Sequence, residues 1–233
     1  MDRAIRARRL AAVGDPHRLE IVDLLTMSDH TPKELMEWCG LTSSLLAHHL
    51  DVLEDVSIIR RRQSSGDRRN RYVALVPRSM NGLLPESRTE LAPTHLKPLR
   101  ALFVCRRNSA RSQLAAALWR SNGMGEADSA GTEPAEVIHP LTVKVAQKAK
   151  LKLPLVKPQH IDDVHTKADV IISVCDEARE HVNAHDEWLH WSIPDPVKAR
   201  SVSAFERTID DLNERIALFG MSQITKPTLG GNR

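Results

Sequence analysis

The hydrophobic periodicity of this chain changes near its middle, and that change constrains the fold more than any other feature. Up to residue 76, apolar residues recur at helical spacing in four short segments, followed by two strand-like runs. From Leu99 onward, apolar runs of strand length alternate with helical segments. Residues 77–98 between them contain four prolines and a weak apolar pattern. We therefore expect two domains, residues 1–80 and 99–222, with a linker at 81–98.

The first 80 residues predict a winged helix-turn-helix, a mainly α domain with a β-hairpin wing. Asp15-Pro16 and Thr31-Pro32 are typical helix starts, and Gly40 is a typical helix end. The expected helices cover residues 5–13, 16–25, 32–39 and 43–55. Two strand-like runs, 57–62 and 71–76, flank a polar turn at 64–67 and predict the hairpin. This order can place one helix in a major groove while the hairpin follows the backbone.

Charge on the hairpin suggests a nucleic-acid partner. The net charge of +3 is too small to indicate one, but six arginines lie between residues 60 and 71. They suit phosphate contacts, although a solvated basic hairpin is the alternative. On helix 43–55, Leu46, Leu50 and Leu53 share one face, which leaves short polar side chains for the outer face. The candidate DNA-binding residues are Ser43, Ser44, His48, His49, Arg61, Arg68, Arg69 and Arg71, and Arg60 and Arg62 complete the basic cluster.

The segments HRLEIVDLL and ELMEWCGLTSSLLAHHLDVLEDVSIIRRR resemble the ArsR family of winged-helix repressors. The resemblance implies a homodimer, formed through the first and last helices, that binds an inverted repeat in double-stranded DNA. Val56-Ser57 departs from the family, which usually has a glycine turn there. Thr31 and Lys33 replace the paired cysteines with which many relatives sense metals, and we expect Cys39 to be packed rather than sensing. We predict no metal site.

A cysteine and an arginine separated by five residues follow the first apolar run of the second half. The run Leu99 to Val104 predicts a strand, Cys105 ends it, and a helix begins near Ser109. Such a loop points backbone N–H groups inward and forms a site for a tetrahedral oxyanion. We expect a lowered pKa for Cys105, which would act as a nucleophile, with Arg111 holding two anion oxygens. The remaining anion-binding candidates are Arg106, Arg107, Asn108, Ser109, Ala110 and Ser112; Asn108 tolerates positive φ, and Ser112 can donate to the sulfur.

This loop, the Ser-Ala-Gly-Thr stretch at 129–132 and Asp195-Pro196 together resemble the low-molecular-weight tyrosine phosphatase family over about 120 residues. Alternation of strands and helices already favours a parallel sheet covered by helices, an α/β fold. The resemblance implies four parallel strands and assigns the general acid to Asp195. A purely structural turn at Asp195 is the alternative.

Two activities compete within this fold. Tyrosine phosphatases hold the phenol ring between aromatic walls, but Val197 follows Asp195-Pro196, and the chain has a single tyrosine, Tyr72, in the other domain. The stretches NSARSQLAAALW and HWSIPDP instead resemble thioredoxin-linked arsenate reductases, including residues Gln113, Trp119, His190 and Trp191. That resemblance implies arsenate as the substrate, because arsenate has the shape and charge of phosphate.

A reductase needs a second thiol, and Cys175 is the candidate. It ends the apolar run Val170 to Val174, and the carboxyl ends of parallel strands meet at one edge of the sheet. By resemblance, Cys175 attacks Cys105, releases arsenite and leaves a disulfide; a small apolar residue closing a strand is the alternative. The reductases carry a further cysteine seven residues later, where this chain has Val182. Either an external redoxin or low-molecular-weight thiol is the reductant, with no bound cofactor, or the domain only senses an oxyanion or redox state.

Composition favours the cytoplasm. The three cysteines, at 39, 105 and 175, do not form a secreted disulfide framework. No run of apolar residues is long enough to cross a membrane, and the first residues lack a signal-peptide core. We expect residues 223–233 to form a disordered tail.

Overall fold

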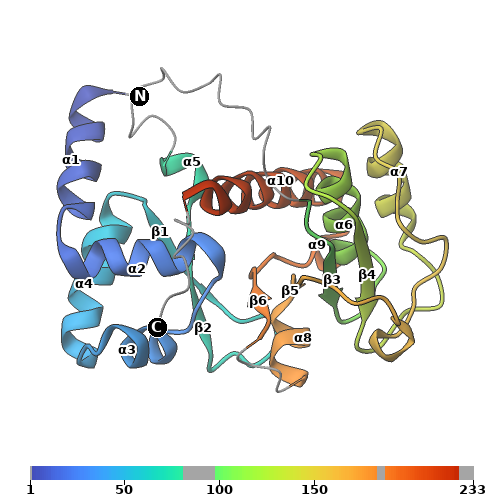
Figure 1. Cartoon of the computed structure of the whole chain (residues 1–233), viewed down its shortest axis with the longest axis horizontal. Coiled ribbons are helices and arrows are strands. Elements are labelled where there is room, and N and C mark those ends of the chain that lie inside the picture. Colours follow the sequence, from blue (N-terminus) through green and yellow to red (C-terminus); the bar gives the residue numbers. More distant parts are fainter. Residues whose placement is uncertain (1, 81–97, 183–186, 226–233) are drawn as a thin grey trace, which may run out of the picture.

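A computed structural model describes residues 2–80, 98–182 and 187–225, and within it the chain forms two domains with separate hydrophobic cores (Figure 1). Its N-terminal domain consists of α1 (Arg3–Val13), α2 (Pro16–Met27), α3 (Pro32–Cys39), α4 (Ser43–Asp55), β1 (Ile59–Gln63) and β2 (Arg71–Leu75). β1 and β2 pair as an antiparallel hairpin, which is the predicted wing. The predicted winged helix-turn-helix is confirmed.

Local signals in the sequence explain where these helices begin and end. The Asp15 side chain accepts a hydrogen bond from the N–H of Arg18 and caps α2, with Pro16 in the first turn. Thr31 and Glu34 form a capping box at α3, and Gly40 ends that helix in the left-handed conformation, with φ of 63°. Ser57, at the turn before the wing, adopts φ of 58°. A serine therefore takes the left-handed conformation that glycine adopts more readily.

The C-terminal domain is an α/β layer structure. A four-stranded parallel sheet has the order β4-β3-β5-β6, which confirms the predicted sheet. Its strands are β3 (Ala101–Cys105), β4 (Ala127–Gly131), β5 (Val170–Ser173) and β6 (Leu189–His190). The helices are α6 (Arg111–Ser121), α7 (Pro140–Lys148), α8 (Asp176–His181), α9 (Pro196–Ala199) and α10 (Val202–Thr225), with a 3-10 turn at Ile161–Asp163. Buried Phe103, Trp119, Trp191 and Phe219 form the aromatic centre of the core.

One predicted boundary was wrong. Helix α10 extends to Thr225, so residues 223–225 of the predicted tail are helical. A short helix, α5 (Pro77–Met80), precedes the predicted linker. Residues 81–97 and 226–233, the rest of the predicted linker and tail, lie outside the described residues. Among the helices that the structure describes, none is both long and apolar enough to span a membrane.

The two domains are joined by a buried polar interface along β6. The N–H of Asp29 donates to the carbonyl of His190 (2.7 Å), and the N–H of His190 donates to the Ser28 hydroxyl (2.9 Å). The Trp191 indole donates to the carbonyl of Met27 (3.0 Å). The Asp29 carboxylate, itself buried, also pairs with buried Arg215 on α10. The turn after α2 thus packs against β6, and in Figure 1 the hairpin runs down beside α8.

Candidate functional site

Cys105 lies at the carboxyl end of the central strand β3, in the loop that leads into α6. Its sulfur accepts a hydrogen bond from the N–H of Asn108 (3.2 Å) and lies 3.1 Å from the Ser112 hydroxyl. Ala110, which precedes α6, offers no side-chain acceptor to the first N–H groups of that helix. Those N–H groups and the positive end of the helix dipole therefore remain available to an anion.

Asn108 braces the loop from inside. It has φ of 48°, the left-handed conformation that its residue type predicts. Its side-chain amide donates to the hydroxyls of Ser112 (2.9 Å) and Ser129 (3.0 Å), and its oxygen accepts from the N–H of Gln159 (3.0 Å). Because these bonds join the loop to three separate segments, they hold it in one shape.

The close approach of β4 to the nucleophile loop requires a glycine at residue 131. A Cβ at this position would lie 2.7 Å from the carbonyl oxygen of Arg106 and 3.0 Å from the Asn108 side chain. Only a residue without a side chain allows β4 to approach the nucleophile loop this closely.

Arg111 and Asp195 meet beside Cys105. The Arg111 side chain is buried, donates to the carbonyl of Ile193 (3.0 Å) and has its Nη2 3.5 Å from a carboxylate oxygen of Asp195. A cavity of about 280 Å³ joins Cys105, Arg111 and Asp195, with Val137 and Val197 among its apolar walls. No Phe, Tyr or Trp is found among the described residues that line it.

Cys175 contacts the backbone of the same loop. It precedes α8, and its sulfur accepts hydrogen bonds from the N–H groups of Ala178 and Arg106 (3.3 Å each). The Cys175 sulfur therefore contacts the backbone at Arg106, the residue next to Cys105. Burial raises the pKa of the Cys175 thiol to about 11, an effect that the nearby Arg111 guanidinium opposes. Cys175 is thus a buried thiol that must lose its proton before it can react.

The other predicted loop residues divide into two groups. The Arg106 side chain turns away from Cys105 and pairs with Glu133 and Glu177. Arg107 and Ser109 line the 280 Å³ cavity, as does Ala110. The Arg106 guanidinium is thus engaged by two carboxylates of its own domain.

The predicted DNA-binding residues are mostly exposed. Ser43, Ser44 and His48 lie on the outer face of α4, and Arg68, Arg69 and Arg71 are exposed on the wing. Arg61 is exposed too, but its guanidinium pairs with Asp51 and Glu54. Two further wing arginines are partly buried, Arg60 and Arg62, and Arg62 donates to the carbonyl of Ser192 (3.0 Å).

The predicted placement of His49 on the outer face is wrong. Its ring is buried, packs against His17 and lies 3.8 Å from the Asp15 carboxylate. Burial lowers its pKa, and Asp15 opposes this effect. Position 49 belongs to the same helical stripe as Leu46, Leu50 and Leu53, so the periodicity itself contained the signal. Cys39, at the end of α3, packs partly buried against the N-terminal core.

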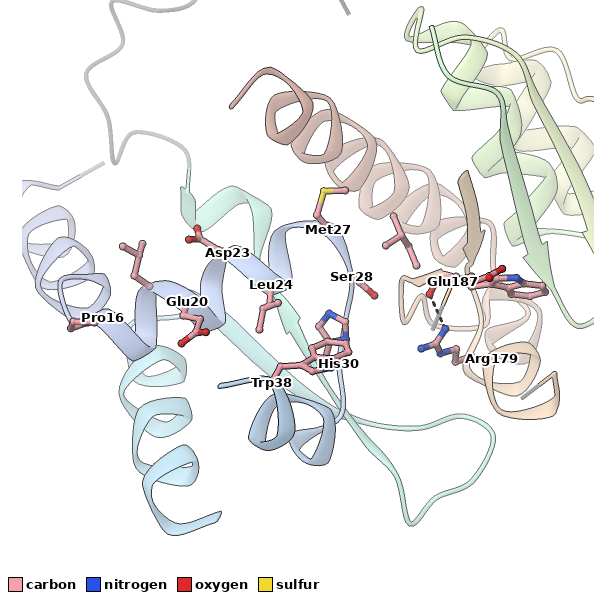
Figure 2. A pocket seen from close by; sticks show the side chains of 13 residues that line it. Pro16, Glu20, Asp23, Leu24, Met27, Ser28, His30, Trp38, Arg179 and Glu187 are labelled. Carbon is pink, nitrogen blue, oxygen red and sulfur yellow. Dashed lines mark hydrogen bonds between the residues drawn. The ribbon is translucent and has the colours of Figure 1, made fainter. Parts of the chain in front are cut away.

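A second cavity, of about 830 Å³, lies between the domains, and neither Cys105 nor Cys175 is among its lining residues (Figure 2). Leu24 and Met27 of α2, Trp38 of α3, and Arg179 and Trp188 of the C-terminal domain are among its lining residues. It is a cleft formed by domain contact rather than an extension of the cysteine site.

Two family models match the chain. The model of the family described as low molecular weight phosphotyrosine protein phosphatase matches residues 100–227, more than half of the chain. The chain belongs to this family. In this member of the phosphatase family, a second model, bacterial regulatory protein of the arsR family, matches residues 15–61. An ArsR-type helix-turn-helix is therefore fused to a phosphatase-family domain, as the two resemblances predicted.

Similar proteins include enzymes with two activities. The phosphatase-family domain is 28% identical over 126 residues to a glutaredoxin arsenate reductase from Synechocystis, a match that covers 50% of this chain and 92% of that protein. An arsenate reductase structure from Archaeoglobus fulgidus is 32% identical, covers 50% of this chain and 94% of that one, and has a TM-score of 0.44. An arginine phosphatase structure from Geobacillus stearothermophilus is 20% identical, with coverages of 55% and 94% and a TM-score of 0.46.

Sequence reasoning missed several residues that support the site. Gln159 holds the loop through a backbone contact that no spacing reveals. Gly131 belongs to the Ser-Ala-Gly-Thr stretch noted in the sequence, but its close approach to the loop was missed. Asp176 and Glu180 of α8 contact the wing, and only the arrangement of the two domains brings them together. For Asp176, its place directly after Cys175 was the one available signal.

Proposed function

We propose that this chain is a thiol-dependent arsenate reductase fused to an ArsR-type DNA-binding regulator. The observation that carries the proposal is that both sulfurs bond to the backbone of one loop: Cys105 accepts from the N–H of Asn108, and Cys175 accepts from the N–H of Arg106, the residue next to Cys105. The similarity to the Synechocystis glutaredoxin arsenate reductase, which spans nearly all of that protein, supports it.

In the first step, arsenate binds to the loop N–H groups and to the Arg111 guanidinium. The Cys105 thiolate, stabilised by the Asn108 N–H and the Ser112 hydroxyl, attacks arsenic. One arsenate oxygen leaves as water and takes a proton from Asp195, which lies beside Arg111. The product is a covalent Cys105 thiol-arsenate adduct.

In the second step, the Cys175 thiolate attacks the Cys105 sulfur. An S–S bond forms, the S–As bond breaks, and its electron pair stays on arsenic, which is reduced from As(V) to As(III). Across both steps, two thiols lose two electrons and two protons, and arsenate becomes arsenite and one water. An external redoxin or low-molecular-weight thiol then reduces the Cys105–Cys175 disulfide. We assign this step to an external donor because Val182 occupies the position of the reductases' further cysteine.

The test is arsenite formation by the purified full chain with thioredoxin, glutaredoxin or glutathione as the reductant. We expect turnover with at least one donor, loss of turnover in Cys105→Ser, and an adduct without turnover in Cys175→Ser. Cys39→Ser is the matched control, because Cys39 lies in the other domain. The proposal fails if no donor supports turnover, or if Cys175→Ser reduces arsenate at the wild-type rate.

A phosphatase activity on small aryl phosphates is the second candidate. The Cys105, Arg111 and Asp195 set supports it, because phosphoryl transfer to Cys105 does not require Cys175. The described residues that line the cavity include no Phe, Tyr or Trp to stack on a phenol ring, which makes a phenolic substrate the second candidate rather than the first. Release of nitrophenol by Cys175→Ser, with a trapped phosphocysteine, would identify this activity.

For the N-terminal domain, we propose binding to double-stranded DNA as a homodimer. The exposed α4 face with Ser43, Ser44 and His48 would enter a major groove, and Arg61, Arg68, Arg69 and Arg71 would contact phosphates. Retarded migration of a labelled duplex in a gel tests DNA binding. The mass of the protein in solution, expected to be twice that of one chain, tests the homodimer.

A further inference from the structure

The tip of the wing lies on α8 of the phosphatase-family domain. Most of the hydrogen bonds between the tip and α8 go to one carboxylate, that of Glu180. Glu180 accepts from the Ser64 hydroxyl (2.8 Å), the N–H of Asp67 (2.6 Å) and the Asn70 amide (3.1 Å). The Tyr72 hydroxyl also donates to it, at 3.4 Å. These donors lie at the end of β1, in the turn and at the start of β2, so Glu180 contacts the whole tip.

Gly66 shows how closely the tip approaches α8. A Cβ added there would lie 2.2 Å from a carboxylate oxygen of Glu180 and 3.2 Å from the Cα of Glu177. The Glu180 carboxylate could shift only by giving up its bonds to the wing, and the backbone at Glu177 has little freedom to move. The contact therefore depends on the absence of a side chain at residue 66.

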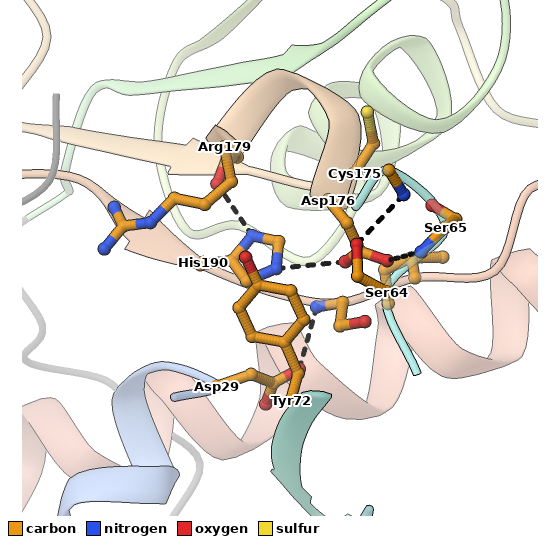
Figure 3. A network of polar contacts seen from close by, with 12 residues as sticks. Asp29, Ser64, Ser65, Tyr72, Cys175, Asp176, Arg179 and His190 are labelled. Atoms are coloured by element: carbon orange, nitrogen blue, oxygen red, sulfur yellow. Dashed lines mark hydrogen bonds and ion pairs between the residues drawn. The ribbon is translucent and has the colours of Figure 1, made fainter. Parts of the chain in front are cut away.

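A second carboxylate links the wing to Cys175 (Figure 3). Asp176, the residue after Cys175, accepts a hydrogen bond from the N–H of Ser65 (2.8 Å) and contacts His190 (3.1 Å). The Tyr72 ring packs on His190, with ring centroids 4.5 Å apart. Although burial opposes ionisation, hydrogen bonds from His190 and the Ser65 N–H lower the pKa of Asp176, so it remains a carboxylate.

This docking disfavours DNA binding for two reasons. The face of the wing formed by Ser64 and Asn70 is covered by α8. The carboxylates of Asp176 and Glu180 also bond to the tip of the basic hairpin, where they repel the phosphates that its arginines would contact. A wing released from α8 presents its arginines without these carboxylates.

We propose that α8 is a docking surface for the wing of the same chain, that docking competes with double-stranded DNA, and that a Cys105–Cys175 disulfide releases the wing. The third part rests on the proposed reductase function, whereas the first two do not. The chemistry is the second step described above: the two thiols lose two protons and two electrons to arsenate.

The path from the disulfide to the wing is short. The Cys175 sulfur is the N-cap acceptor of α8, bonded to the N–H of Ala178, and it also accepts from Arg106. An S–S bond of about 2.05 Å requires this sulfur to move to Cys105 and to abandon the cap. The first turn of α8 then loses its fixed start, and Asp176 and Glu180 no longer hold their positions against the wing.

The docking test compares duplex affinity among variants of the full, reduced chain, with a fluorescein-labelled mixed-sequence duplex at fixed salt. Glu180→Ala removes the main acceptor, and Gly66→Ala blocks the approach without changing charge. We expect both to tighten binding by about tenfold, because each loses several charge-assisted hydrogen bonds of docking. Glu136→Ala, an exposed carboxylate on the same domain, and Gly14→Ala, whose Cβ meets only ordinary contacts, are the matched controls.

Docking is overturned if Glu180→Ala and Gly66→Ala bind the duplex no more tightly than their controls. The fold of both variants is checked by circular dichroism and by the rate of arsenate reduction or of Cys105 alkylation. Wild-type values in these measurements exclude unfolding as the cause of that result.

The redox test repeats the measurement after arsenate or diamide treatment, with the Cys105–Cys175 disulfide verified by mass. Oxidised wild type should bind as tightly as Glu180→Ala, while Cys175→Ser should not respond. If the disulfide forms and affinity is unchanged, release by the disulfide is overturned. If diamide tightens binding but arsenate never forms the disulfide, the reductase proposal fails while the docking switch stands.

Discussion

The nucleophile loop and the wing tip are both held by dense hydrogen bonding, but the bonds come from different sources. Asn108 ties the loop to Ser112 and Ser129 of its own domain. The wing tip is instead tied to Glu180 and Asp176 of the other domain. The difference teaches that the anion site keeps its shape whatever the wing does, whereas the shape and exposure of the wing depend on α8.

The largest effect is expected at Arg111. Arg111→Lys keeps a charge but loses the planar fork that can hold two anion oxygens, so kcat/KM for arsenate should fall by about 100- to 1,000-fold. Duplex affinity of the reduced protein should not change, because Arg111 contacts no residue of the wing among the bonds described. Arg107→Lys, at the exposed rim of the cavity, is the control and should lose less than about threefold. Equal losses in the two variants would contradict the role given to Arg111.

The next effect concerns pH. Because the pKa of Cys175 is raised to about 11, its thiolate fraction increases about tenfold per pH unit below that value. The single-turnover rate of Cys105–Cys175 disulfide formation, at saturating arsenate, should therefore rise about 100-fold between pH 6.5 and 8.5. Rapid acid quenching and mass measurement would follow it. A plateau near pH 7 would show that Cys175 is not the buried, protonated thiol described here.

Gly131→Ala should have an intermediate effect, because its Cβ would meet the Arg106 carbonyl and the Asn108 side chain. We expect a loss of about 1–3 kcal/mol in the free energy of unfolding and about tenfold in kcat/KM. Thermal denaturation and steady-state kinetics would measure the two changes. Gly14→Ala is the control, and wild-type activity in Gly131→Ala would show that the loop is less rigid than its contacts indicate.

The smallest effect is expected on the wing. Arg68→Ala and Arg71→Ala should each weaken duplex binding a few-fold and reduce the salt dependence of log affinity by about one phosphate contact. Arg62→Ala should not, because Arg62 donates to Ser192 of the other domain instead of facing solvent. Equal losses of duplex affinity in Arg62→Ala and in the two exposed variants would contradict this difference between docked and exposed arginines.

Much of each domain was predictable from local patterns. Helix caps such as Asp15 and Thr31, the hairpin and the Cys105 to Arg111 spacing indicated the right elements in the right order. His49 was misplaced because a polar residue type was weighed above its helical position. Glu180, Asp176 and Gly66 were unpredictable for another reason: their roles arise where two domains meet, and the contacts join residues more than 100 positions apart.

The most direct test of the account is a mass measurement of the reduced, purified chain after treatment with arsenate in the absence of any external thiol. The account predicts that one molecule of arsenite forms per chain and that peptide mapping finds a single disulfide joining Cys105 to Cys175. Free thiols at both positions, or a disulfide that involves Cys39, would contradict it.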